Sequence, residues 1–236
     1  MSQPLATTSS VKVVTESIIF PPGDIYSDEP PLESDLHREQ IDLLIRLIKW
    51  WWRDRNDFYA TGNLTIYFSP NQKKSEEFRG PDFFVVLDAE KKDRKSWVVW
   101  QEDGKYPNAI VELLSDSTAS VDKGLKKQIY QNTFRTPDYF WFDPVSLELR
   151  GFHLIDGQYQ DLAPTESGRL WSQQLGLYLG VESGKLRFFT PDGQLVMLPE
   201  EEANQQLQQA NQQLEQERQR AAILAERLRA AGIDPE

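Results

Sequence analysis

The sequence contains no cysteine, and this absence removes several classes of protein at once. Without cysteine there is no disulfide framework, no cysteine-ligated zinc or iron–sulfur site and no cysteine nucleophile. The two histidines, His37 and His153, are far apart in the chain, so a histidine-based zinc site is not expected either. Nothing points to an oxidising compartment, and we expect a cytoplasmic protein.

Long apolar runs and positive charge are also scarce. No stretch of about 18 apolar residues exists, and residues 1–20 lack a basic segment followed by an apolar core and a cleavage site. We therefore expect a soluble protein with no signal peptide and no membrane partner. The 26 basic residues against 37 acidic ones give a net charge of −11, which opposes general attraction to nucleic acid. Any nucleic-acid site must be local.

Aromatic residues, in contrast, are plentiful: seven Trp, eight Tyr and twelve Phe among 236 residues can fill a sizeable core. The length suits one domain of about 200 residues with an appendage, or two small domains. Composition shifts divide the chain into an irregular lead-in (1–33), a folded domain (34–198) and a helical tail (199–236).

Hydrophobic periodicity predicts both helices and strands within the folded domain. Apolar residues at helical spacing indicate a long amphipathic helix over about 35–54 and a second helix over 117–134. Runs rich in β-branched and aromatic residues indicate strands within 57–68, 81–88, 96–100, 108–115 and 139–143, followed by short strands separated by Asp-Gly and Ser-Gly turns. A helix between two buried strands is a crossover, so we predict an α/β or α+β fold with a mixed sheet and an antiparallel β extension.

The tail has a heptad pattern. Its small or apolar residues step by alternating four and three over about four to five repeats, interrupted by one glutamate: Ala203, Leu207, Ala210, Leu214, Glu217, Ala221, Leu224, Leu228 and Ala231. This predicts a coiled-coil-like helix that joins two copies in a homodimer. Because alanine and glutamate weaken the seam, a lone helix or one folded onto the domain is the alternative.

Two carboxylates occupy unusual positions. Glu112 lies inside the apolar run 109–114, on the same predicted strand face as Ile110 and Leu114, where a charge is costly unless paired, protonated or bound to a cation. Asp82 opens the apolar strand FFVVL and is expected at the rim of the sheet. Two carboxylates on neighbouring strands are typical ligands of Mg²⁺. The structural alternatives are a turn aspartate after Pro81 and a buried ion pair for Glu112.

The helix that follows carries Asp122, Lys126 and Tyr130 on one stripe, four residues apart. One interpretation is a solvated face with a weak helix ion pair. The other is a lysine that leans over the sheet toward the carboxylates, where it orients water and offsets charge on a phosphate. His37, in the first turn of the long helix, is either a packed core histidine or part of this site.

Other chemistries find no support, since the sequence has no Gly-rich phosphate loop and no serine in a strained elbow. A site of carboxylates, a metal and a lysine remains. The basic residues that flank it and are candidates for nucleic-acid contacts are Lys73, Lys74, Arg79, Lys91, Lys92, Arg94, Lys95, Lys123, Lys126 and Lys127.

These residues resemble the Uma-two family of restriction endonucleases. The resemblance covers roughly residues 34–154 and rests on Pro81-Asp82, on VELLSDST around Glu112, on VDKGLKKQIY, and on PDYFWFDP at 137–144. The family resembles the PD-(D/E)XK nucleases, whose fold is a mixed sheet flanked by helices. The resemblance therefore implies a restriction-endonuclease-like fold for the domain 34–198.

The resemblance also implies a site and an activity. Asp82 and Glu112 would hold one or two Mg²⁺ or Mn²⁺ ions for hydrolysis of DNA. The superfamily has a lysine two positions after the second acid, where this sequence has Leu114; Lys126 of the following helix matches the missing lysine, with Lys127 as the alternative. His37 matches a histidine frequent in the first helix, and Asp122 and Tyr130 would line the pocket.

Two hypotheses therefore stand at the level of sequence. The first is a Mg²⁺-dependent endodeoxyribonuclease with catalytic residues His37, Asp82, Glu112, Asp122, Lys126 and Tyr130. The second is a non-catalytic module of the same fold that recruits partners through its tail. The acidic composition and the long tail favour the second, whereas a carboxylate kept inside a buried strand favours the first.

Overall fold

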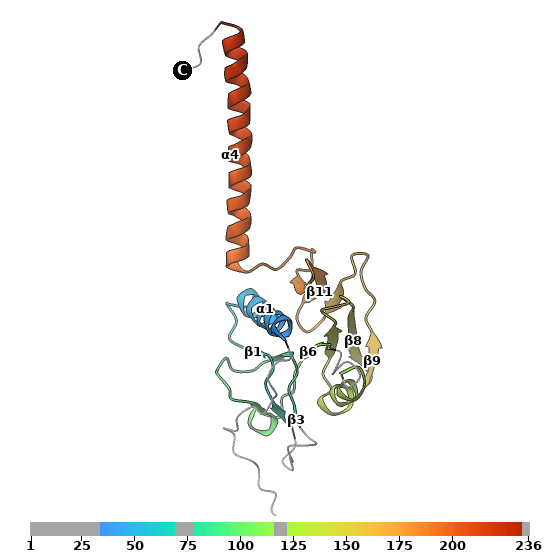
Figure 1. Ribbon diagram of the computed structural model, residues 1–236. Coiled ribbons are helices and arrows are strands. Elements are labelled where there is room, and N and C mark those ends of the chain that lie inside the picture. Colours follow the sequence, from blue (N-terminus) through green and yellow to red (C-terminus); the bar gives the residue numbers. More distant parts are fainter. Residues whose placement is uncertain (1–33, 69–77, 116–121, 233–236) are drawn as a thin grey trace, which may run out of the picture.

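A computed structural model describes residues 34–68, 78–115 and 122–232 (Figure 1). Its centre is a six-stranded sheet of order β1-β4-β6-β7-β8-β9. The strands are β1 (Phe58–Thr61), β4 (Phe83–Leu87), β6 (Ala109–Leu113), β7 (Asp138–Phe142), β8 (Leu149–Ile155) and β9 (Gln158–Asp161). β6 and β7 are parallel and the other neighbours in this sheet are antiparallel. The predicted α+β fold with a mixed sheet and an antiparallel extension is confirmed.

Helix α1 (Asp35–Trp51) covers one face of the sheet. Ser34 caps its N-terminus, because the Ser34 Oγ accepts a hydrogen bond from the His37 backbone N–H at 3.2 Å. Leu44, Leu47 and Ile48 are fully buried against the strands; the helical spacing predicted burial of Leu44 and Ile48, whereas Leu36 and Trp51 of the same predicted face are exposed. The helix ends three residues earlier than expected, and the ring of Trp52 packs edge-on against Phe58 with 5.0 Å between centroids.

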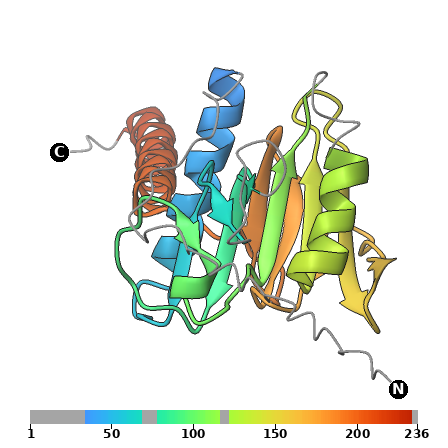
Figure 2. The same cartoon turned by 90° about the horizontal axis from the view of Figure 1, so that it is seen from below.

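The opposite face of the sheet carries the crossover helix between β6 and β7 (Figure 2). Its described part consists of η2 (Asp122–Lys126), α3 (Lys127–Ile129) and η3 (Tyr130–Phe134), and both η segments have the wide π-helical winding. Leu125 is 53% exposed, whereas Tyr130 and Phe134 are buried and Ile129 packs against the same cluster. The stripe of Lys126 and Tyr130 therefore faces the sheet together with Phe134, and Leu125 faces away from it.

One strand prediction was wrong. The segment 57–68 forms two strands in different sheets, because the chain turns at Gly62 and Asn63, and Asn63 adopts a left-handed φ of 47°. The second piece, β2 (Ile66–Tyr67), joins β3 (Phe78–Arg79) and β5 (Trp97–Val98) in a small sheet. The expected strand at 96–100 is correspondingly short and continues as the 3₁₀ helix η1 (Val99–Gln101).

The antiparallel extension ends in a three-stranded sheet of β10 (Leu170–Ser172), β11 (Leu177–Glu182) and β12 (Lys185–Phe189). A buried carboxylate fixes it to the central sheet. Asp138 of β7 accepts hydrogen bonds from the Ser172 hydroxyl at 2.6 Å and the Gln174 backbone N–H at 2.8 Å, and contacts His153 Nδ1 at 2.6 Å. His153 thus has a structural role beside this buried carboxylate.

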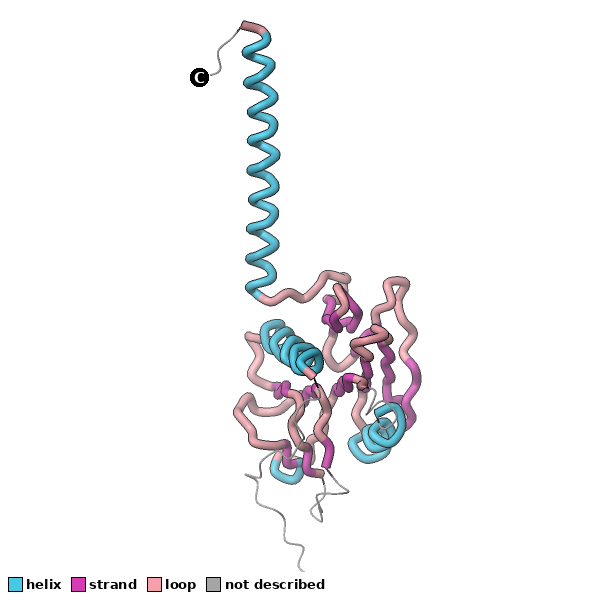
Figure 3. The backbone as a smooth tube through the Cα atoms, in the orientation of Figure 1, coloured by secondary structure: helices cyan, strands magenta, loops and turns pink. Residues whose placement is uncertain are grey.

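Helix α4 (Pro199–Ala230) projects away from the domain (Figure 3). Its first turn is tied down by Arg187, whose guanidinium donates to both carboxylate oxygens of Glu201 at 2.8 and 2.7 Å, and by an ion pair between Arg46 and Glu200. The Glu201 side chain also accepts from the Leu198 backbone N–H at 2.8 Å, which completes the cap. None of the described helices is both long and apolar enough to cross a membrane.

Candidate active site

The register of β4 and β6 places the two unusual carboxylates opposite each other. Phe83 pairs with Val111 in this antiparallel ladder, so one step further Asp82 lies opposite Glu112. The Asp82 backbone N–H is 3.4 Å from Glu112 Oε2, and Asp82 Oδ2 accepts a hydrogen bond from the Leu113 backbone N–H at 2.7 Å. Both side chains therefore project from the same end and the same face of the two strands.

Gly62 allows the chain to approach this point closely. A Cβ atom at Gly62 would lie 2.1 Å from the Asp82 carbonyl oxygen and 2.5 Å from Ile41 Cγ2. Asn63 then donates its backbone N–H to the Pro81 carbonyl at 3.0 Å, which holds the β1 end against the start of β4. Sequence reasoning missed Gly62, although the Gly-Asn pair within the predicted strand was a signal for a turn.

Glu112 is fully buried and receives two donors from the crossover helix. The Tyr130 hydroxyl donates to Oε1 at 2.6 Å, and the Lys126 ammonium donates to Oε2 at 3.1 Å. One turn of helix separates these donors, so the same stripe supplies both. The two contacts fix the carboxylate of Glu112 in one orientation above the sheet.

Burial dominates the electrostatics of Glu112. It raises the pKa of this carboxyl from 4.5 to about 7; the Lys126 ammonium opposes the shift, and the neighbouring Asp82 carboxyl adds to it. Near neutral pH the site thus holds a carboxyl group close to half-ionisation in a space shared with a second acid. Perturbed pairs of this kind are typical of functional sites.

His37 supports the site through the backbone. Its Nε2 is 3.2 Å from the Leu113 carbonyl oxygen, and its Nδ1 is 3.0 Å from Ser34 Oγ. Because a carbonyl oxygen only accepts hydrogen bonds, the proton of a neutral imidazole belongs on Nε2, and Nδ1 accepts from the serine hydroxyl. His37 holds the strand residue whose N–H binds Asp82, so its contacts are those of a positioning residue.

A family model described as "Putative restriction endonuclease" matches residues 15–188 of the chain. The protein belongs to the Uma2 family.

The chain is also similar to two individual proteins. It is 31% identical over 109 residues to slr1290, an uncharacterized protein of Synechocystis, and the match covers 46% of this chain and 54% of that one. The chain thus spans about half the length of this relative. A crystal structure of a "putative nuclease belonging to DUF820" from Anabaena variabilis aligns with a TM-score of 0.45 at 11% identity, covering 62% of this chain and 76% of that one.

Of the remaining predicted site residues, one lies away from Glu112 and one has its side chain outside the described part of the chain. Lys127 points to the other side of the helix, where its ammonium lies 3.3 Å from the centroid of the Phe152 ring. Of the two lysines that the Uma2 resemblance allowed, Lys126 is therefore the one beside Glu112. The side chain of Asp122 lies outside the described residues.

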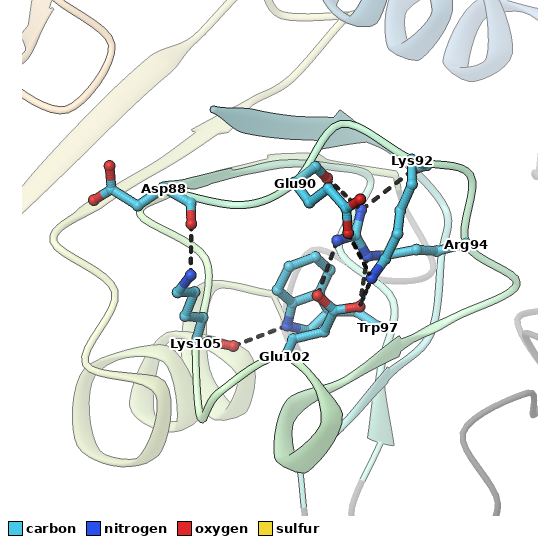
Figure 4. Close-up of polar contacts among 7 residues, drawn as sticks. All are labelled: Asp88, Glu90, Lys92, Arg94, Trp97, Glu102 and Lys105. Carbon is cyan, nitrogen blue, oxygen red and sulfur yellow. Dashed lines mark hydrogen bonds and ion pairs between the residues drawn. The ribbon is translucent and has the colours of Figure 1, made fainter. Parts of the chain in front are cut away.

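Part of the predicted basic surface is internally paired. The Arg94 side chain is only 4% exposed, forms two hydrogen bonds with Glu102 at 2.7 and 2.8 Å, and lies over the Trp97 ring (Figure 4). Lys105 closes the same loop by donating to the Asp88 carbonyl oxygen. Arg94 thus stabilises the loop and is not exposed to bind phosphate. Trp97, fully buried, is likewise a core residue.

A second group of basic residues lines a pocket beside β1. The pocket has a volume of about 300 Å³ and is lined by Lys49, Lys91, Lys92 and Asp93 together with Phe58, Tyr59 and Ala60. Of these lysines, Lys92 pairs with Glu90 at 3.1 Å. Among the described residues, Lys49 and Lys91 have no carboxylate within ion-pair distance. In a chain of net charge −11 this local excess of positive charge is unusual.

The acidic pair suits a divalent cation. No group of three or more His, Asp or Glu side chains that suits a metal is found in the described ranges, but Mg²⁺ commonly takes one or two carboxylates and completes its shell with water. Oε2 of Glu112 accepts from Lys126 and from the Asp82 backbone N–H, whereas Oε1 accepts from Tyr130 and keeps one lone pair for a cation. A cation would also relieve the repulsion by Asp82, which adds to the effect of burial on the pKa of Glu112.

Proposed function

We propose that this Uma2 protein is a metal-dependent endonuclease that hydrolyses phosphodiester bonds in DNA. The observation that carries the proposal is the pairing of Asp82 and Glu112 at one sheet end with Lys126 bonded to the second acid. A fully buried Glu112 beside a second, partly buried acid has little value for stability, since burying charge is costly even when it is paired with an ammonium. The family description supports the same activity.

Asp82 and Glu112 would hold Mg²⁺ or Mn²⁺, and the bound cation would polarise the phosphate and acidify a water molecule. In the hydrolysis, a water oxygen bonds to phosphorus, one P–O ester bond breaks, and the leaving oxygen takes up a proton. The residues of the chain prepare this step before substrate arrives. Tyr130 fixes the rotamer of Glu112, and the Leu113 N–H fixes Asp82.

Lys126 has a second role in this proposal. Its side chain is 19% exposed, so its ammonium reaches both the buried Glu112 and the surface. A phosphate that approaches the acids therefore meets a positive charge, which stabilises the additional negative charge of the transition state. Asp122 lies one turn before Lys126 in the sequence and would line the same entrance.

The basic pocket of Lys49, Lys91 and Lys92 would contact the DNA backbone. It lies at the Phe58 end of β1, whereas Asp82 lies beyond the opposite end of the paired strand β4. Phosphate contacts at a distance from the scissile bond position a duplex without reading its sequence. Such local contacts allow an acidic protein to bind DNA.

The experiment that tests the proposed function combines calorimetric titration of Mg²⁺ and Mn²⁺ with a plasmid-nicking assay on the same samples. We expect the wild type to bind the metal and to nick DNA only in its presence. Asp82→Asn and Glu112→Gln should lose both properties. Glu148→Gln removes an exposed carboxylate that pairs with Arg150, and this control should retain both.

A second candidate function is a non-catalytic interaction module. It is favoured by the observation that Lys126 and Tyr130 already satisfy both oxygens of Glu112. In that case neither metal would bind the wild type above the level seen with Glu112→Gln, and no nicking would occur. That result would refute the nuclease proposal.

For the oligomeric state, we propose a homodimer formed through α4, whose heptad pattern continues from Ala203 to Ala231.

A further inference from the structure

The apolar side of α4 is uncovered along its whole length. This 32-residue helix, roughly 48 Å long at 1.5 Å per residue, contains no buried residue. Leu207, Leu214 and Leu224 are 60%, 48% and 59% exposed. A helix that gains nothing from packing is marginal in water, because propensity alone rarely stabilises it. The exposed leucines therefore indicate that another helix covers this side.

The period of the pattern identifies what kind of helix that is. The seam residues recur on average every 3.5 positions, so the pattern repeats every seven residues. This is the period of a left-handed coiled coil. Position a of the heptad holds Leu207, Leu214, Ala221 and Leu228, and position d holds Ala203, Ala210, Glu217 and Leu224. The flanking e and g positions carry no acidic residue: they are Asn204, Gln206, Asn211, Gln213, Arg218, Arg220, Ala225 and Arg227.

Glu217 is the charged residue in this seam, and it distinguishes the two possible orientations of the pair. In an antiparallel pair, position d faces position a of the partner helix, so Glu217 would lie against Leu214 or Ala221. There the carboxylate would keep the nearby Arg220 of its own helix but would gain only apolar neighbours from the partner, which do not compensate for the water that it loses. In a parallel, in-register pair the two Glu217 residues share one layer.

The charges around that layer favour the parallel arrangement. Arg218 of each helix is at position e, next to the d layer of the other helix, and Arg220 follows Glu217 by three residues on the same helix face. Four guanidinium groups thus surround two carboxylates. Such a polar layer fits only itself, so a shift of register would place each carboxylate among apolar side chains.

We propose that two copies of this chain pair α4 as a parallel coiled coil in register, and that the Glu217 layer sets orientation and register. The partner is a second copy because a layer of two carboxylates and four arginines is self-complementary. The first turn of α4 is fixed to its domain by the ion pairs of Arg187 with Glu201 and Arg46 with Glu200. Parallel pairing therefore places both domains at the same end of the coil, side by side.

The parallel arrangement has a consequence for cleavage, and this consequence rests on the proposed endonuclease function. Two acid pairs at the same end of one dimer can address both strands of a duplex, whereas an antiparallel coil would hold them apart by the length of the helix. Pairing itself does not depend on catalysis.

Engineered cysteines test the proposal directly, because the natural sequence has none. In the full chain, Ala210→Cys and Leu224→Cys place one thiol at position d, near the start and near the end of the seam. We expect each variant alone to form a disulfide-linked dimer under mild oxidation. Gln212→Cys, at the outer position f, is the matched control and should remain uncrosslinked.

The outcomes are distinct. Cross-links that form only when Leu207→Cys and Leu224→Cys chains are mixed would show antiparallel pairing and overturn the proposal. A monomeric mass by light scattering, with no cross-link in any variant, would also overturn it. Because covalent dimers are read without substrate, neither result would bear on the nuclease proposal.

Substitution of the seam glutamate provides a second measurement. Glu217→Leu removes the two carboxylates from the seam and should tighten the dimer, seen as a lower dissociation constant. Glu226→Leu makes the same change at position f and should leave the dissociation constant unchanged. Equal effects of the two substitutions would show that Glu217 is not in the interface.

Discussion

Replacement of Glu112 by glutamine should stabilise the metal-free protein above neutral pH while it removes the proposed activity. The wild-type carboxyl is fully buried, and its pKa is raised from 4.5 to about 7 by burial and by Asp82, against the opposing effect of Lys126. Glutamine fills the same space and cannot ionise. Its carbonyl oxygen can accept from Lys126, and its amide group can donate to the Tyr130 hydroxyl.

The size and sign follow from proton linkage. Between pH 4.5 and 7 the folded protein holds a proton on Glu112 that the unfolded chain has released, so the stability of the wild type falls as pH rises through this window. The difference of 2.5 pKa units, from 4.5 to 7, corresponds to about 3 kcal/mol. The stability of Glu112→Gln relative to wild type should therefore increase by about 3 kcal/mol between pH 4.5 and pH 8. In a domain of this size that is a rise of roughly 6–12 °C in Tm.

The assay is thermal or urea unfolding of both proteins in EDTA at several pH values. Glu102→Gln is a control for which the change in stability should depend on pH in the opposite direction. Burial alone would raise the pKa of Glu102, but its hydrogen bonds and charge interaction with Arg94 outweigh burial and lower the pKa. Glu102 therefore contributes stability that is present above its unfolded pKa and lost as pH falls. Its substitution should cost most at pH 8.

A constant difference between Glu112→Gln and wild type from pH 4.5 to 8 would refute the reasoning. It would mean that Glu112 titrates in the folded protein as it does in the unfolded chain, and so is not held in a desolvated site.

Three further predictions test the surroundings of the site. Gly62→Ala should cost about 1–3 kcal/mol of unfolding free energy and abolish nicking, because its Cβ would overlap a carbonyl oxygen of the neighbouring strand. Tyr130→Phe leaves a buried carboxylate oxygen without its donor and should cost about 1–3 kcal/mol at pH 8, measured by urea unfolding. The double variant Lys49→Gln, Lys91→Gln should weaken DNA binding at low salt and lower the slope of log affinity against log salt by about 1–2; Arg229→Gln, on α4, should change neither.

The fold was predictable from sequence where the pattern was local. Burial of Leu44 and Ile48 follows from helical spacing, and the continuous apolar run of β6 indicated a strand covered on both faces. The division of 57–68 into two sheets was not predictable in the same way, because alternation of side chains does not show which strand lies alongside. The chain turns between the two strands at Asn63, which has a left-handed backbone conformation. The Gly-Asn pair signals this turn but not the sheet that each strand joins.

The structure brings Asp82, Glu112, Lys126 and Tyr130 together, and all four were singled out from the sequence as candidate site residues. Glu112 was identified because a charge within an apolar strand requires compensation, and Asp82 because it opens the neighbouring strand. The spacing of four residues places Lys126 and Tyr130 on one helix stripe, but their contacts with Glu112 depend on how the helix packs on the sheet, which the sequence does not show. His37 required tertiary information, since it acts on the Leu113 backbone 76 residues away.

Under the proposed function, Lys126 supplies from the crossover helix the ammonium group that the resemblance would place on the strand, two residues after Glu112. The strand position two residues after Glu112 holds Leu114, which is 3% exposed and packs in the apolar cluster beneath the crossover helix. A lysine at position 114 would have to bury its charged group among the apolar side chains of this cluster. The helix above the same face supplies the charge instead, with its amine 3.1 Å from Glu112 and its side chain 19% exposed. The carboxylate therefore gains a cation at a position where the side chain remains partly hydrated, which costs less desolvation than a lysine in the strand.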